Sequence, residues 1–132
     1  MKKLILLIVL FGKLLNGFSQ SYQKELQNLN KFCKTYEGSN ITNIEVNDGI
    51  LIVTKNSGNI QKALMSDIDE VTTKEETYYT GAHLKCKNSE GCISQTSSNR
   101  KATSFVFQTK NKNDLPKIVE LLNAFLDAYN KK

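Results

Sequence analysis

Tryptophan is absent from this chain of 132 residues, and proline and histidine each occur once. The three cysteines are an odd number, so at most one disulfide can form within the chain. Length and composition together exclude a collagen, a coiled coil, a multi-pass membrane protein and a large multidomain enzyme. A single histidine without a nucleophile motif also makes an enzyme the weakest class, so we expect a small non-enzymatic domain.

Long hydrophobic runs are also scarce, and the main one lies near the start, at residues 4–11. Lys2 and Lys3 precede this run, and Gly17 and Ser19 are small residues suited to a cleavage site after Ser19. The run is too short for a transmembrane helix, which needs about 20 apolar residues. The pattern predicts a cleaved signal peptide over residues 1–19 and a secreted or periplasmic protein. Lys13 interrupts the apolar stretch, which leaves an uncleaved anchor as the alternative.

The positive charge belongs mostly to this leader. The whole chain carries a formal charge of +5, and removing Lys2, Lys3 and Lys13 leaves 15 basic against 13 acidic residues, or +2. A surplus this small gives no support to nucleic-acid binding. Residues 20–132 form one domain, because no repeat and no linker divides them.

Two segments have the periodicity of amphipathic helices. Apolar residues recur at intervals of three and four over residues 20–37 and again over residues 113–130. Asn113 or Asp114 is expected to cap the second helix, and Pro116 is tolerated in its first turn.

Residues 41–109 between these helices are rich in short strands. Apolar segments are separated by the turns 47–49 and 56–58, whose Asn, Asp and Gly residues tolerate positive φ. The clearest hairpin is expected from residues 82–86 and 92–95, and the polar stretch 96–102 is expected to be a loop. The segment 72–81 is ambiguous. The composition therefore indicates an α+β domain, mainly antiparallel β.

About seven strands followed by one amphipathic helix resemble a pleckstrin-homology-like domain, in which a bent barrel is capped by a C-terminal helix. The stretch 84–93, followed by Phe105-Val106-Phe107 and the closing helix, also resembles secreted bacterial domains of unassigned role. The helix at 20–37 would be an addition to that fold. A helix on a curved sheet, as in cystatin-like proteins, is the alternative, but it leaves no place for the second helix.

Phosphoinositide-binding relatives of that family carry basic residues around the first hairpin loop. Here the loop is Asn47-Asp48-Gly49 beside Glu45, with only Lys55 nearby. The resemblance therefore implies a protein-interaction module rather than specific phosphoinositide binding.

Cys86 and Cys92 flank a five-residue turn. Directly opposed Cβ atoms in a hairpin lie about 4.5–5.5 Å apart, closer in non-hydrogen-bonded pairs, which allows a structural disulfide. A metal site of Cys33, His83, Cys86 and Cys92 is the alternative, but His83 and Cys86 are three residues apart and would point to opposite faces of a strand. We therefore expect no metal and no cofactor.

The remaining chemical candidates are few. Cys33 lies in the apolar stripe of the first helix and is expected to be buried, with an intermolecular disulfide as the alternative. Acidic residues between 67 and 76 are expected to form a solvated edge. Tyr78 and Tyr79, with Arg100 and Lys101, are the candidates for contact with a partner.

These observations favour an exported, non-enzymatic interaction module whose partner is a protein. A carrier of a small apolar ligand and a secreted enzyme inhibitor are the alternative functions.

Overall fold

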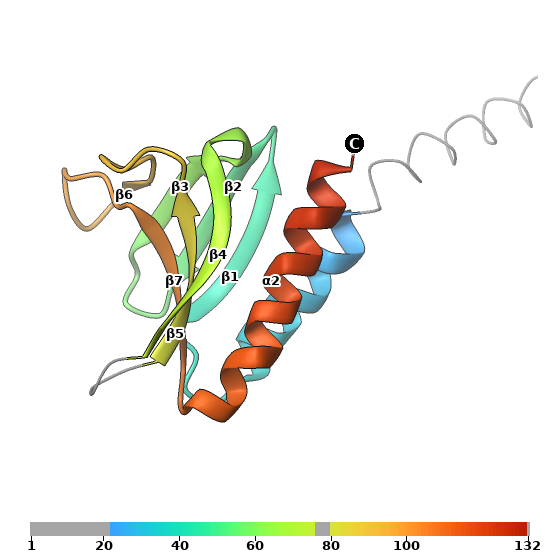
Figure 1. Ribbon diagram of the computed structural model, residues 1–132. Coiled ribbons are helices and arrows are strands. Elements are labelled where there is room, and N and C mark those ends of the chain that lie inside the picture. The colour runs from blue at the N-terminus through green and yellow to red at the C-terminus, as the bar shows by residue number, and fades with distance from the viewer. Residues whose placement is uncertain (1–21, 76–79, 132) are drawn as a thin grey trace, which may run out of the picture.

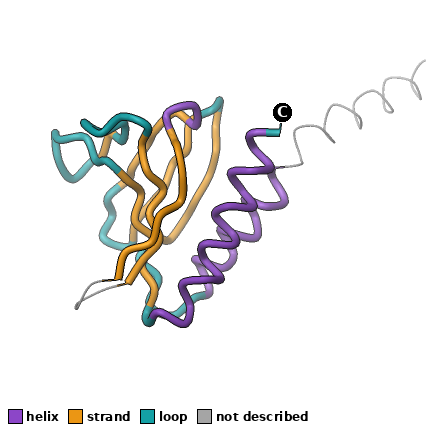
Figure 2. Tube along the Cα trace, in the orientation of Figure 1, coloured by secondary structure: helices purple, strands orange, loops and turns teal. Residues whose placement is uncertain are grey.

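The computed structural model describes residues 22–75 and 80–131, which form two helices and seven strands (Figures 1 and 2). The predicted signal peptide, residues 20 and 21 of the predicted first helix, and the candidates Tyr78 and Tyr79 lie outside this range. The N-terminal helix covers residues 22–35. The other elements are β1 (Ile41–Asn47), β2 (Ile50–Lys55), β3 (Ile60–Leu64), the 3₁₀ turn η1 (Met65–Asp67), β4 (Ile68–Glu75), β5 (Thr80–Cys86), β6 (Ser94–Gln95), β7 (Ser104–Thr109), the 3₁₀ turn η2 (Lys112–Asp114) and α2 (Leu115–Asn130).

The strands form two antiparallel sheets. The first sheet has the order β1-β2-β3-β6, and the second has the order β4-β5-β7. The predicted α+β class with antiparallel strands and a C-terminal helix is therefore confirmed. The two sheets share no strand among the described residues, so their backbone ladders do not close a barrel.

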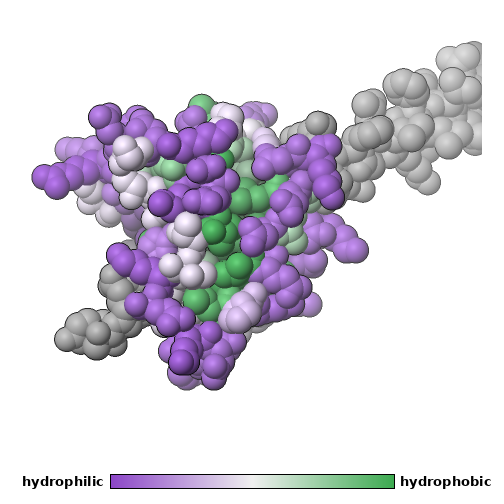
Figure 3. All heavy atoms as spheres, viewed as in Figure 1, coloured by the Kyte–Doolittle hydropathy of each residue, from purple (hydrophilic) through white to green (hydrophobic). Residues whose placement is uncertain are grey.

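Strand alternation directs one face of each sheet into a common core. Leu51 and Val53 of β2, Leu84 of β5, and Phe105 and Phe107 of β7 are almost completely buried. Their alternation with more exposed residues shows the period of two that a strand with one buried face requires. On the face viewed in Figure 3, most of the visible hydrophobic residues form a band near the centre, framed by hydrophilic residues.

The two helices lie side by side against the same face of the strands (Figure 1). They run antiparallel, since Tyr22 contacts Tyr129 with ring centroids 5.1 Å apart, while Tyr36 donates a hydrogen bond of 2.5 Å to Asp114 at the start of α2. The predicted apolar stripes supply the contacts that cover the core. The buried residues are Leu26, Leu29 and Cys33 of the first helix and Leu115, Ile118, Leu121, Leu122, Phe125 and Leu126 of α2. No helix in the described ranges has the length and apolarity to cross a membrane.

Two local predictions are wrong. The segment containing residues 92–95 does not pair with residues 82–86, because both edges of β5 are occupied by β4 and β7. Strand β6 pairs with β3 in the other sheet instead. The predicted helix cap also differs: the side chain of Asn111 accepts a hydrogen bond from the backbone of Asn113, whereas Asp114 is engaged by Tyr36.

The side chain of Asn40 joins the two sheets at one corner. Its Nδ2 atom donates to the carbonyl oxygen of Val106 at 2.9 Å, and its Oδ1 atom accepts from the backbone N–H of Gln108 at 3.0 Å. The backbone carbonyl of Asn40 accepts from Asn56 at 2.9 Å, on the β2 side of the first sheet. One amide side chain thus supplies, between β1 and β7, the pair of hydrogen bonds that a strand ladder would otherwise make.

We predict that Asn40→Ala lowers the free energy of unfolding by about 2 kcal/mol, because each of the two bonds contributes roughly 1 kcal/mol. Asn40→Asp keeps the acceptor for Gln108 but places a carboxylate oxygen against the carbonyl oxygen of Val106, so it should be at least as destabilising as the alanine variant. Urea unfolding measures both changes. An alanine variant as stable as the wild type would show that the two side-chain hydrogen bonds of Asn40 do not stabilise the fold.

Candidate functional site

A disulfide-linked corner connects the end of β5 to the segment that leads into β6. The sulfur atoms of Cys86 and Cys92 lie at bonding distance, with the Cα atoms 5.7 Å apart. The enclosed turn ends at Gly91, whose φ is +107° and whose missing Cβ would lie 2.9 Å from the carbonyl oxygen of Ala102. Glycine is required there both by conformation and by this close approach. The backbone N–H of Lys87 donates to the carbonyl of Asp67 at 2.8 Å, which ties the corner to η1.

A network of side-chain amides holds the loop that follows β6. Gln61 donates to Oε1 of Gln95 at 3.1 Å, and Nε2 of Gln95 donates to the carbonyl of Arg100 at 3.0 Å. Asn59 accepts from the backbone N–H of Ser97 at 3.1 Å. Gln61 is only 3% exposed, so one end of this network is anchored inside the protein. The polar loop 96–101 is therefore fixed in position by side chains of β3 and β6 and of the residue before β3.

The outward face of the first sheet carries four aliphatic residues, which we call the outer stripe: Ile50, Ile52, Ile60 and Leu64. The ladder places Ile50 opposite Leu64, Ile52 opposite Lys62, and Thr54 opposite Ile60, so all of these side chains point away from the core. The isoleucines are half-buried and Leu64 is 50% exposed. The outward face of an antiparallel sheet is usually polar. A group of aliphatic side chains on that face is typical of a surface that another molecule covers.

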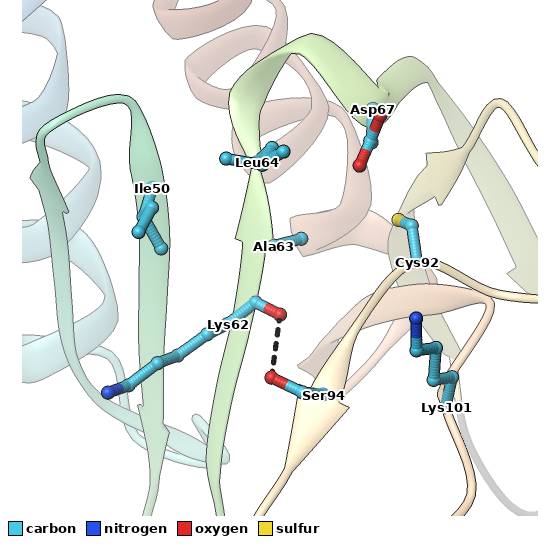
Figure 4. A pocket seen from close by; sticks show the side chains of 8 residues that line it. All are labelled: Ile50, Lys62, Ala63, Leu64, Asp67, Cys92, Ser94 and Lys101. Atoms are coloured by element: carbon cyan, nitrogen blue, oxygen red, sulfur yellow. Dashed lines mark hydrogen bonds between the residues drawn. The ribbon is translucent and has the colours of Figure 1, made fainter.

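A groove of about 350 Å³ adjoins the outer stripe (Figure 4). The ladder between β3 and β6 ends at Lys62, so the last residues of β3 border the groove instead of a further strand. Asp67 and Lys101 approach from opposite sides of Cys92, as Figure 4 shows. The lining consists of Ile50, Lys62, Ala63, Leu64, Asp67, Cys92, Ser94 and Lys101.

The charges around the groove are mostly positive. Lys62 and Lys101 line it together with one carboxylate, Asp67, and Arg100 lies next to Lys101 on the loop. Glu45 borders the outer stripe on the far side, since β1 places it opposite Ile52. The groove therefore combines an apolar wall with an excess of cations on the side of β6.

The predicted site residues have different outcomes. Lys101 lines the groove and Arg100 lies exposed beside it, whereas Tyr78 and Tyr79 fall outside the described residues. Cys33 is buried on the core side of the first helix, whereas His83 lies on the outward face of β5, with its Nδ1 atom 3.0 Å from Oγ of Ser104. In residues 22–75 and 80–131 no three His, Cys, Asp or Glu side chains gather in a way that could hold a metal ion.

The outer stripe itself was not predicted, although the sequence contained its signal. Residues 50–53 are consecutively apolar, and such a run is expected of a strand that is covered on both faces. The inner face of β2 meets the core, so Ile50 and Ile52 form an apolar outer face that the core does not cover. The position of Leu64 on the same face depends on the register of β3, which places it opposite Ile50 and is not encoded in a local pattern.

The chain matches no protein-family model, no curated protein sequence and no solved structure.

We predict that Cys86→Ser/Cys92→Ser lowers the free energy of unfolding by about 2 kcal/mol, the chain-entropy value for closing so short a loop. Urea unfolding of the variant and of the reduced wild type should give the same loss. Cys33→Ala is the control, because its effect should not depend on reductant. A double variant that unfolds like the oxidised wild type would contradict a stabilising role for the bridge.

Burial raises the pKa of the Cys33 thiol to about 12. The unfolded chain ionises this thiol at a lower pH, so its contribution to stability is complete below about pH 9 and is lost as the pH rises towards about 12. Between about pH 8 and pH 10.5 the wild type should lose roughly 2 kcal/mol more stability than Cys33→Ala. Parallel pH profiles of the two proteins in urea unfolding would contradict this prediction.

Proposed function

We propose that this protein is an exported, non-enzymatic interaction module that binds a segment of a partner protein at the outer stripe and the adjoining groove. The observation that carries the proposal is the exposure of Leu64, 50% accessible on a sheet face where Ile50, Ile52 and Ile60 are also apolar. Apolar anchors that sit beside a rigid groove account for most of the binding energy in protein interfaces.

The charge around the groove defines the partner segment. An apolar side chain would pack on Leu64 and Ile50, and a neighbouring carboxylate would meet Lys101 at the other wall. Self-association through this surface is disfavoured. A two-fold dimer would bring the Lys62 ammonium groups of the two copies towards each other, and these like charges would repel. The proposed ligand is thus an extended segment in which an apolar residue lies next to Asp or Glu.

Two features support export and the kind of fold. The leader at residues 1–19 has the layout of a signal peptide with cleavage after Ser19, and an oxidising compartment would preserve the Cys86–Cys92 bridge. The order of strands followed by a C-terminal helix fits a pleckstrin-homology-like arrangement with an added N-terminal helix. In this arrangement the side chain of Asn40, rather than a continuous strand ladder, would join the two sheets.

We predict that Leu64→Glu weakens peptide binding at least about tenfold, because it replaces the exposed anchor with a charge of the ligand's own sign. The probe is a displayed library of random dodecapeptides selected on the wild-type domain, residues 20–132. Selected peptides should carry an apolar residue beside Asp or Glu. They should shift the amide signals of Ile50, Lys62, Leu64 and Ser94, and Lys101→Glu should also weaken them.

Gln108→Glu is the matched control, since it adds the same charge at an exposed position of β7 in the other sheet. It should bind like the wild type. Leu64→Glu should change the free energy of unfolding by less than about 1 kcal/mol, as expected for a half-exposed position. Selected peptides that bind Leu64→Glu normally would contradict the proposal. Dimerisation of the free domain that Leu64→Glu abolishes would instead assign the surface to a second copy of the chain.

A further inference from the structure

A second hollow, of about 290 Å³, lies at the second sheet and has a polar lining throughout. The inward residues of β5 are Ala82, Leu84 and Cys86, so the alternating residues His83 and Lys85 point outward. The ladder places Thr72 opposite His83, and Lys85 opposite Ser104. The lining consists of Thr72, Thr73, Lys74, His83, Lys85, Thr103 and Ser104.

Among the residues that the structure describes, this lining combines positively charged side chains with hydroxyl groups and includes no carboxylate. Lys85 supplies an ammonium group, and Thr72 and Ser104, which lie opposite His83 and Lys85 in the ladders, supply hydroxyl donors. The carboxylates of the same strand, at Asp69, Glu70 and Glu75, are not part of the lining. Ammonium and hydroxyl donors without a competing carboxylate are the groups that bind an oxyanion.

The contact between His83 and Ser104 fixes part of this arrangement. Nδ1 of His83 lies 3.0 Å from Oγ of Ser104. When Nδ1 donates, the hydroxyl oxygen of Ser104 is the acceptor and its own hydrogen remains available for a ligand. Ser104 also lies directly across the ladder from Lys85, so one hydroxyl and one ammonium group can reach the same anion.

We propose that this hollow binds a phosphoryl group, with Lys85 and Ser104 as its principal ligands. The site is separate from the first hairpin turn at residues 47–49 and from the groove beside Leu64, so it is independent of the proposed protein-binding function. Free phosphate and the phosphomonoester headgroup of a lipid present the same chemistry, and the experiment distinguishes them.

The test is a titration of the ¹⁵N-labelled domain with inorganic phosphate, followed through the amide signals of His83, Lys85, Thr103 and Ser104. These signals should shift together and saturate. Lys85→Gln should weaken binding at least about fivefold, and Ser104→Ala should also weaken it, because each removes a donor to the anion. Lys34→Gln, which removes an exposed lysine from the first helix, is the matched control and should leave the affinity unchanged.

Shifts that do not saturate would overturn the proposal, because they indicate general charge attraction. An equal loss of affinity in Lys85→Gln and Lys34→Gln would overturn it for the same reason. In a second arm, phosphatidylcholine vesicles with and without phosphatidic acid are sedimented with the protein. Co-sedimentation that needs phosphatidic acid and Lys85 identifies a lipid headgroup as the source of the phosphoryl group. Binding of inorganic phosphate without co-sedimentation identifies a soluble phosphate compound.

Discussion

The amide side chain of Asn40 is the constraint on which the arrangement of the two sheets depends. It bonds to Val106 and Gln108 of β7 while its own backbone carbonyl is held by Asn56, so it connects the edges of sheets that share no ladder in the described chain. With β1 and β7 fixed at this corner, both inner faces contribute to one core, which the antiparallel helix pair covers. On the other side, a backbone bridge between Ile93 and Ala102 links the segments that precede β6 and β7, and the groove beside Leu64 lies on the β6 side.

Covalent and amide contacts make that side firm enough to serve as a binding surface. The Cys86–Cys92 bridge attaches β5 to the approach to β6, and Gln61 and Gln95 hold the loop that carries Lys101. Ordering a flexible loop during binding costs conformational entropy, and a loop that is already held avoids most of this cost. The same contacts that substitute for a closed barrel therefore also prepare the proposed interface.

The elements predicted with most success were those encoded by local periodicity. Most residues of the two predicted apolar stripes, such as Leu29 and Phe125, are buried as expected, because a helix depends on neighbours three and four residues away. Tyr36 and Tyr129, at the ends of the stripes, are only partly buried. The predicted hairpin between residues 82–86 and 92–95 was wrong because β4 and β7 pair with both edges of β5. A turn sequence does not reveal that strands from elsewhere in the chain compete for those edges. The Tyr36–Asp114 bond, which replaced the expected cap, likewise joins residues far apart in the chain.

An apolar sheet face that lies beside an unpaired strand edge promotes aggregation. In this protein the apolar outer stripe is kept apart from such an edge. Lys62 divides the outer stripe between Ile60 and Leu64, and β6, although only two residues long, occupies the adjoining part of β3. At the edge of the other sheet, β4 has an irregular register between Ile68 and Val71, where Asp69 and Glu70 place two charges. Irregular register and charge both oppose edge-to-edge pairing with another copy. The exposed aliphatic side chains are therefore accessible from the face of the sheet. In the function proposed above, Lys101 and Asp67 of the groove would select the ligand there, whereas backbone pairing at an edge would accept any extended chain.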